Sequence, residues 1–154
     1  MPCCPAFTSK RDRLAVMSTG TGAGSSTIPE EAKRSADMAV AADPDNAEAY
    51  SVLGYLDHFY FWDWESAERN VRRALEIAPN DAEIANFAGD FFIYMLNFKD
   101  GFAWEERAAE LDPLHAVNFM DLSWRSLAAG RCEDALAYGD KTLEIDPAFI
   151  FVVM

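Results

Sequence analysis

Apolar residues recur with a helical period from residue 28 onward, and prolines divide this pattern into units. The dividing prolines are Pro44, Pro79, Pro113 and Pro147, at intervals of 35, 34 and 34 residues. A proline just past a helix ends it, because proline lacks a backbone N–H and its ring clashes with the preceding turn. The spacing therefore predicts repeated helix–turn–helix units. These are a half unit at 29–45, full units at 46–80, 81–114 and 115–148, and the start of a further helix at 149–154.

Small residues recur at matching positions of the units. Gly54, Gly89 and Ser123 stand where the two helices of a unit would cross, and Ala74 and Ala108 where a second helix would meet the next unit. A larger side chain there would overpack the contact at a cost of about 1–3 kcal/mol. The pattern predicts closely packed pairs of helices.

Polar residues mark where the helices begin. Asn46 and Asp81 stand at N-cap positions, and Asp63 caps a helix that begins at Trp64. The interval of 35 residues contains one residue more than the others, and we place the extra residue in the aromatic stretch 59–64.

The order of residues in the first full unit carries a family resemblance. The unit contains Tyr50, Leu53, Gly54, Ala67, Val71, Ala74 and Pro79. This order resembles the tetratricopeptide repeat family, and the resemblance covers about residues 29–150. It is looser in the second and third units. The resemblance implies an all-α fold, a right-handed α-solenoid of antiparallel helix pairs, that binds protein or peptide partners.

The Trp-Asp-Trp sequence at 62–64, with the residues that follow it to Leu75, narrows the resemblance. It is similar to repeat arrays that accompany winged-helix transcriptional regulators and nucleotide cyclases in bacteria. This likeness implies a part in a bacterial signalling or regulatory protein. The chain itself contains no winged-helix, cyclase or kinase motif.

The resemblance also implies a concave groove lined by the first helix of every unit. The groove residues that we expect are Glu48, Ser51, Tyr55, His58, Glu83, Asn86, Asp90, Tyr94, Asp121 and Trp124. Such a surface is acidic and aromatic, so it would attract a basic or apolar segment. Family members that hold acidic C-terminal tails use Lys, Arg and Asn at groove positions, and only Asn86 fits that pattern here.

The charge of the chain excludes several partners. The formal net charge is -13, although residues 1–28 carry three basic residues and one acidic residue. An acidic surface repels phosphate backbones and anionic membranes, so we expect neither nucleic-acid nor membrane binding. The Gly/Ser/Thr-rich stretch 18–27 predicts a flexible N-terminal segment over 1–28. Three cysteines, two of them adjacent, form no disulfide framework, which favours the cytoplasm.

Catalytic chemistry has little support in the sequence. His58 and His115 have no Cys or His at metal-ligand spacing, and His58 is interpreted as a surface histidine that could contact a ligand. Cys132 fits a small buried apolar residue. The carboxylates scatter over helix starts and outer faces instead of forming a pair in a pocket. We therefore expect no enzyme activity, no metal and no cofactor.

The aromatic stretch and the chain ends each allow two interpretations. Trp62 and Trp64 either form an exposed platform or fill the gap between two helices; filling is favoured for Trp64, and Tyr60 and Trp62 stay open. The chain starts with half a unit and ends on the apolar run 148–154, so it is expected to belong to a longer array or to form a homo-oligomer. A structural spacer or self-association element without a groove ligand is the alternative function.

Overall fold

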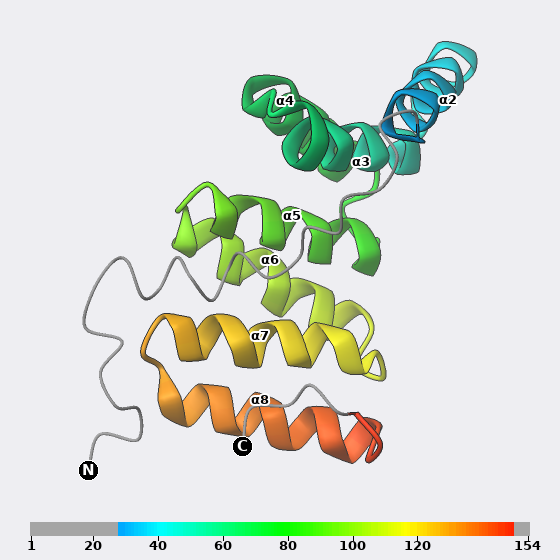
Figure 1. The fold of residues 1–154 in the computed structure, drawn as a ribbon. Helices are drawn as coiled ribbons and strands as arrows, with labels where there is room; N and C mark the ends of the chain where they lie inside the picture. The colour runs from blue at the N-terminus through cyan, green and yellow to red at the C-terminus, as the bar shows by residue number, and fades with distance from the viewer. Residues whose placement is uncertain (1–27, 150–154) are drawn as a thin grey trace. The chain divides into compact units, whose positions relative to one another are not determined.

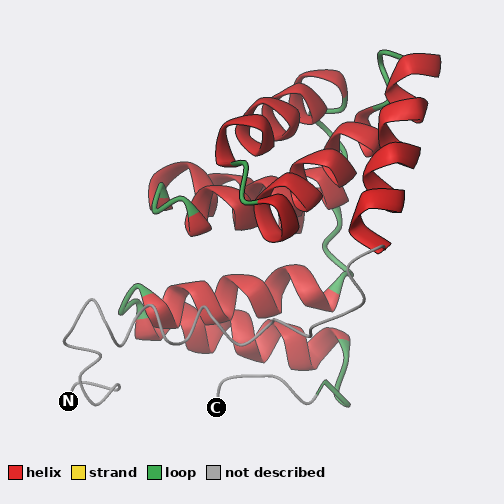
Figure 2. Cartoon of the chain, turned by 45° about the horizontal axis from the view of Figure 1, so that its top comes forward, coloured by secondary structure: helices red, strands yellow, loops and turns green. Residues whose placement is uncertain are grey.

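The computed structural model describes residues 28–149, and the predicted flexible N-terminal segment lies outside the described residues except for Ile28. The elements are α2 (Ile28–Ala42), α3 (Ala47–Leu56), the π-helix η1 (Asp57–Phe61), α4 (Trp64–Ile77), α5 (Ala82–Tyr94), α6 (Phe98–Leu111), α7 (Ala116–Ala128) and α8 (Cys132–Ile145). Within the described range, helices and loops make up the whole structure (Figure 2). The predicted all-α class is confirmed.

The chain divides into two compact units, one that contains α2–α6 and one that contains α7 and α8. In the α2–α6 unit, α3 packs against α4 and α5 packs against α6 (Figure 1). A short turn joins α5 to α6, whereas η1 and the turn after it join α3 to α4. The helix starts follow the predicted caps. The Asn46 side chain accepts a hydrogen bond from the Ala49 amide at 2.9 Å, and the Asp81 carboxylate accepts one from the Ile84 amide at 3.1 Å.

The small residues allow the paired helices to approach closely, as predicted. A Cβ atom on Gly89 would stand 2.9 Å from the backbone nitrogen of Glu105, and one on Gly54 would stand 2.9 Å from Cγ2 of Val71. Gly101, on α6, faces Gly89 and leaves the same kind of room. Both helices of the α5–α6 pair therefore contribute a glycine to their crossing, whereas the α3–α4 pair has one.

The core of the α2–α6 unit lies between the two helix pairs. Buried residues of α4 and α5 meet there: Ala67, Val71, Ala74, Leu75, Ile84, Ala88, Phe91 and Phe92. Ala74 is fully covered at the position where we predicted a contact with the next unit. Burial of side chains of this size stabilises the fold by about 25 cal/mol for each Å² of apolar surface removed from water.

The extra residue of the first full unit is accommodated in η1, at the end of α3. A π-helix closes hydrogen bonds over five residues instead of four, so it takes in one more residue than an α-helix. The turn after η1 passes through Trp62, whose φ of 56° is left-handed. The corresponding positions of the other turns are Leu96, with a φ of 62°, and Gly130, with a φ of 78°. Side chains other than glycine pay roughly 1 kcal/mol or more in this conformation.

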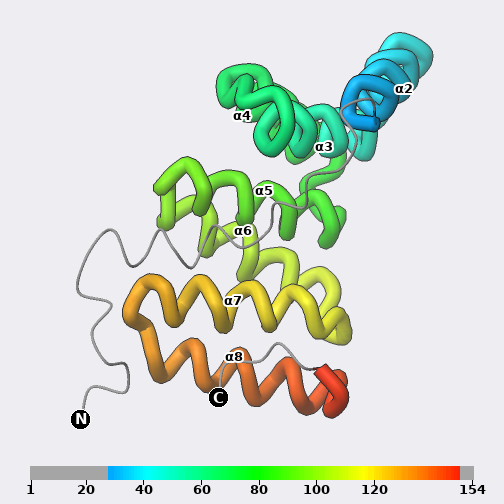
Figure 3. The backbone as a smooth tube through the Cα atoms, viewed as in Figure 1, coloured from blue at the N-terminus to red at the C-terminus, as the bar shows by residue number. Residues whose placement is uncertain are grey.

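The α7–α8 unit is a single helix pair with a short turn (Figure 3). The turn uses a Schellman arrangement, in which the Arg131 amide donates to the Ser126 carbonyl at 2.8 Å. Ser123, predicted at the crossing of the two helices, is fully buried and donates to the Ala135 carbonyl at 2.7 Å. A small hydroxyl thus stands where the other two pairs have glycine, and its polar atom is satisfied by the partner helix.

Candidate functional site

Aromatic rings from α3 and η1 contact rings from α5. The Tyr55 ring lies 5.8 Å from the Phe87 ring, centroid to centroid, and the Phe59 ring lies 5.4 Å from that of Tyr94. Within η1 and the end of α3, Tyr55 also contacts Phe59 at 4.7 Å. These tilted and edge-on arrangements are the favourable geometries for aromatic pairs. The first helices of two successive repeats, α3 and α5, therefore share one aromatic surface.

His58 lies beneath this surface. Its ring contacts Phe59 edge-on at 4.4 Å, and the rings of Phe91 and Tyr94 lie at 5.5 Å. The side chain is 9% exposed, and Nδ1 has no hydrogen-bond partner. Burial lowers the pKa of His58 below 6.5, and the charge of Asp90 opposes that shift. The interpretation of His58 as a surface histidine is therefore wrong, because α5 packs over it.

Tyr55 stands at the exposed rim of the same surface. Its pKa is raised above 10.0, first by partial burial and then by the ionised forms of Tyr60, Tyr94 and Asp90. These three groups therefore lie close enough to Tyr55 to interact with its charge. Four of the predicted groove residues, Tyr55, His58, Asp90 and Tyr94, are brought together in this way.

The other predicted groove residues of the α2–α6 unit lie on the same two helices, nearer their N-termini. Glu48 and Glu83 are exposed in the first turns of α3 and α5, and Ser51 and Asn86 are half-buried. We use the name α3–α5 face for the eight residues Glu48, Ser51, Tyr55, His58, Glu83, Asn86, Asp90 and Tyr94. Asp121 and Trp124 lie on α7 in the other compact unit, and their part in a groove stays a prediction.

Basic and acidic residues are distributed unevenly among the helices of the α2–α6 unit. Residues 28–111 contain seven basic and eighteen acidic residues, a formal charge of -11. None of the basic residues belongs to α3, η1 or α5. The arginines of α4 instead pair with carboxylates on that helix or in the loop before α3, as Arg72 does with Glu68 at 2.7 Å and Arg73 with Asp45 at 2.8 Å. The helices that form the α3–α5 face thus contribute carboxylates without a Lys or Arg.

The aromatic stretch after α3 corrects a prediction. Trp62 is 67% exposed and Trp64 is 50% exposed, so neither fills the gap between the two helices of its unit. Trp62 has a left-handed backbone, and Trp64 is the first residue of α4. Val71 and Phe87 lie beside Gly54 instead. The two indoles contact each other edge-on at 6.4 Å.

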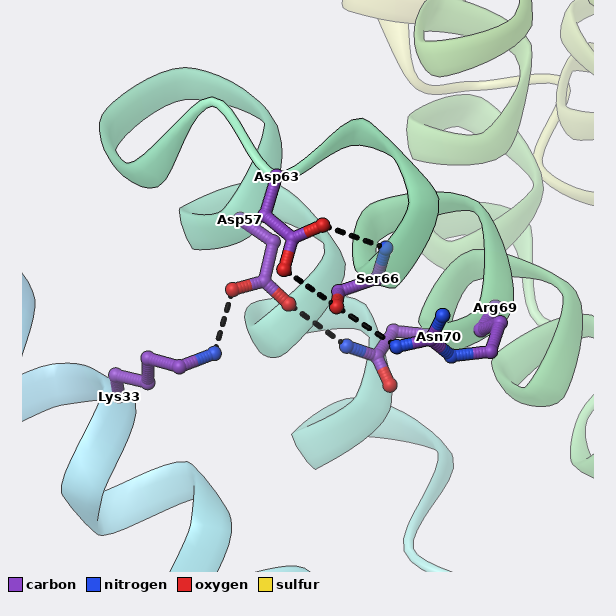
Figure 4. A network of polar contacts seen from close by, with 6 residues as sticks. All are labelled: Lys33, Asp57, Asp63, Ser66, Arg69 and Asn70. Atoms are coloured by element: carbon purple, nitrogen blue, oxygen red, sulfur yellow. Dashed lines mark hydrogen bonds and ion pairs between the residues drawn. The ribbon is translucent and has the colours of Figure 1, made fainter.

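A buried ion pair beside η1 was missed by the sequence reasoning. The Asp57 carboxylate is 2% exposed, accepts a hydrogen bond from Asn70 Nδ2 at 3.0 Å and pairs with Lys33 Nζ at 2.5 Å (Figure 4). These contacts join α2, η1 and α4. The available signal was the position of Asp57 three residues after Gly54, on the face of α3 that packs against α4.

Residues 28–149 hold no group of three or more His, Cys, Asp or Glu residues suited to a metal ion. The helices of this range are too short or too polar to cross a membrane. Cys132, predicted to be buried, is half-buried at the start of α8.

Antiparallel helix pairs, glycines at their crossings and a period of about 34 residues define a tetratricopeptide-like, all-α fold. The chain is similar to a crystal structure of MamA, with a TM-score of 0.68 and 20% identity over 89% of this chain and 75% of that one. It is also similar to MamA from residue 41 to its end from Desulfovibrio magneticus RS-1, with a TM-score of 0.68, 15% identity, and 91% and 75% of the two chains covered. No protein-family model matches the sequence, and no curated protein matches it. These likenesses concern the fold.

Proposed function

We propose that the chain is a protein-interaction scaffold whose α3–α5 face binds a basic segment of a partner protein. The observation that carries this proposal is the sorting of charge. The elements α3, η1 and α5 carry aromatic rings and four of the carboxylates of residues 28–111, whereas all Lys and Arg of this range belong to other helices. A surface of this kind speeds the approach of a cationic segment and disfavours acidic ones.

The aromatic rings supply the second part of the recognition. Tyr55 and Tyr60 are exposed, and Phe59 and Tyr94 are half-buried beside them. A Lys or Arg side chain placed over such rings gains about 0.5–1 kcal/mol for each contact at an exposed site. The contacts of Tyr55 with Phe59 and Phe87 hold its ring in place before a partner arrives, which reduces the entropy lost on binding.

The direct test is binding of short fluorescent peptides that carry Lys or Arg between aromatic residues, followed by fluorescence anisotropy. We expect Tyr55→Ala to weaken the best peptide about tenfold or less, since it removes one or two ring contacts. Glu83→Gln removes an exposed carboxylate of the face. It should weaken binding more at low ionic strength than at high ionic strength, because salt screens the interaction with this charge.

The matched control is Glu106→Gln, which removes an exposed carboxylate from α6. If this control weakens binding as much as Glu83→Gln does, the peptide responds to the net charge of the chain and the proposed face is wrong. The same conclusion follows if Tyr55→Ala and Glu83→Gln both leave the affinity unchanged while circular dichroism shows an intact fold.

The wider setting of the scaffold is a further part of this proposal. The Trp-Asp-Trp segment at 62–64 supports a place in a bacterial signalling or regulatory protein of the cytoplasm. Sequencing the gene together with its neighbourhood tests this. A regulatory or cyclase domain in the same reading frame is the expected result, and a setting unrelated to signalling contradicts it.

A further inference from the structure

The turn between η1 and α4 presents two exposed indoles with a carboxylate between them in the sequence. The Trp62 and Trp64 rings meet at an interplanar angle of 72°, so they form two walls of a corner. Asp63 lies between them in the sequence and is exposed. We use the name Trp-Asp-Trp corner for these three residues.

The carboxylate of the corner is fixed and ionised. Asp63 accepts hydrogen bonds from the Ser66 hydroxyl at 2.6 Å and from the Ser66 amide at 3.1 Å, and Arg69 Nη2 donates to the Ser66 hydroxyl at 2.8 Å (Figure 4). Hydrogen bonds from Ser66 lower the pKa of Asp63, so the group keeps its negative charge at neutral pH. The corner therefore combines electron-rich ring faces with a permanent negative charge.

Cations of the chain already cover other rings of this unit. Lys33 Nζ lies 5.4 Å from the centroid of the Phe61 ring, and the Arg72 guanidinium lies 5.1 Å from that of Phe92. Among the described residues, no Lys or Arg covers Trp62 or Trp64, although tryptophan is the strongest partner of cations among the aromatic side chains. The two indole rings thus receive no cation from this part of the chain, whereas Asp63 lies near Arg69 and Lys33, whose charges lower its pKa further.

The next helix pair offers a natural comparison. Leu96, Asn97 and Phe98 occupy the positions of Trp62, Asp63 and Trp64, with a left-handed residue first and the first residue of a helix last. Leu96 and Phe98 are also exposed. Exposure alone is thus a property of the position, whereas the indoles and the carboxylate belong to the first pair only.

We propose that the Trp-Asp-Trp corner binds an arginine side chain of a protein partner, at a surface distinct from the α3–α5 face. Arginine fits better than lysine, because its planar guanidinium stacks on aromatic faces and is more weakly hydrated. The acidic surroundings favour the positively charged guanidinium over a neutral apolar side chain, since residues 28–111 carry a formal charge of -11.

The experiment follows the indole N–H signals of Trp62 and Trp64 by nuclear magnetic resonance, in the full chain at about 150 mM salt. The probe is an N-acetylated tetra-arginine amide, and the matched neutral probe is the corresponding tetra-citrulline amide. We expect saturable shifts of both indole signals with the arginine peptide and weaker ones with the tetra-lysine amide. Unmoved indole signals, or equal shifts with the citrulline peptide, would overturn the proposal.

Variants separate the corner from general attraction to an acidic protein. Trp62→Gly suits the left-handed backbone, Trp64→Ala removes the second wall, and Asp63→Asn keeps the helix cap while it removes the charge. Each variant should lower the affinity for the arginine peptide about two- to fivefold. This is the loss expected when one exposed cation–π contact or one surface charge is removed. Their folding is checked by circular dichroism.

The matched controls are Leu96→Gly and Phe98→Ala, at the same positions of the α5–α6 pair. They should leave the affinity unchanged, and an equal loss in these controls would overturn the proposal. Tyr55→Ala should also leave the indole shifts intact, because Tyr55 belongs to the α3–α5 face. A result that contradicts binding at the Trp-Asp-Trp corner is therefore distinguishable from one that contradicts binding at the α3–α5 face.

Discussion

The helix pairs α3–α4 and α5–α6 follow the same repeat, but different residues meet where the two helices of each pair cross. In α5–α6, Gly89 and Gly101 face each other and bring the two backbones close. In α3–α4, Gly54 meets the Val71 side chain. The α3–α4 pair contains one residue more, which lies in the π-helix η1, and Asp57 of η1 forms a buried ion pair with Lys33. Close backbone packing holds α5 against α6, whereas the contact of Gly54 with Val71 and the hydrogen bond of Asp57 with Asn70 hold α3 and η1 against α4.

Gly89→Ala should have the largest effect on this comparison. Its Cβ would stand 2.9 Å from the Glu105 backbone nitrogen, which cannot move without shifting α6. We expect a loss of about 2–3 kcal/mol in the free energy of unfolding, measured by urea denaturation. Gly54→Ala is the matched change in the other pair. Its Cβ would meet Cγ2 of the buried Val71 at 2.9 Å, whereas the Val71 backbone nitrogen would stand 3.4 Å away, so the side chain has to shift but α4 does not. Gly54→Ala should cost about 1–2 kcal/mol, less than Gly89→Ala, because alanine also favours the helix. Equal costs would contradict the difference between the two pairs.

Lys33→Met should come next, with a loss of about 2 kcal/mol. The variant leaves the buried Asp57 carboxylate without its cation, and only the Asn70 hydrogen bond remains. Breaking a buried pair typically costs about 3–5 kcal/mol, and we reduce that figure because Lys33 is 34% exposed. Arg69→Met, at an exposed ion pair with Glu65, is the control and should cost less than about 1 kcal/mol. Equal effects would show that the Asp57 pair is merely another surface pair.

Removal of the N-cap side chain should lower the stability of the chain equally in the two pairs. Asn46→Ala and Asp81→Ala each remove one side-chain acceptor at the start of α3 or α5. Each should cost about 1 kcal/mol in thermal denaturation, whereas Asp81→Asn should be nearly neutral because asparagine caps as well as aspartate. A cost confined to one pair would show that local capping matters unequally in the two.

The smallest expected effect is a dependence on pH through His58. Its pKa is lower in the folded chain than the ordinary 6.5, so the unfolded chain binds more protons just below that pH. The contribution of neutral His58 to stability is fully present above about pH 6.5 and is lost as the pH falls toward the folded pKa. His58→Phe should flatten this part of the stability profile. An unchanged slope in the variant would contradict the burial of a neutral imidazole.

Local features of the fold could be predicted from the sequence. Prolines, caps and small residues act on neighbouring backbone or at fixed repeat positions, so Asn46, Asp81 and Gly89 were placed correctly. The interval of 35 residues revealed an added residue. It could not reveal that a π-helix takes it in, because the choice depends on how the turn closes against α4.

The candidate site could be predicted only in part. The helical period placed Tyr55 and Asp90 on first helices, yet the burial of His58 depends on its contacts with Phe91 and Tyr94, over thirty residues away. The pairing of Lys33 with Asp57 joins residues 24 positions apart, and no local pattern connects them. Sequence periodicity identifies a face of a helix, whereas burial and pairing require the packed neighbours.

The most direct test of the proposed function is a map of backbone amide shifts on addition of the tightest basic peptide. The proposal predicts that, apart from the Trp-Asp-Trp corner, the largest shifts lie in residues 47–61 and 82–94, which form α3, η1 and α5. Tyr55→Ala should reduce these shifts at the same peptide concentration. Largest shifts in α4 and α6, with α3, η1 and α5 unchanged, would contradict the assignment of the binding surface.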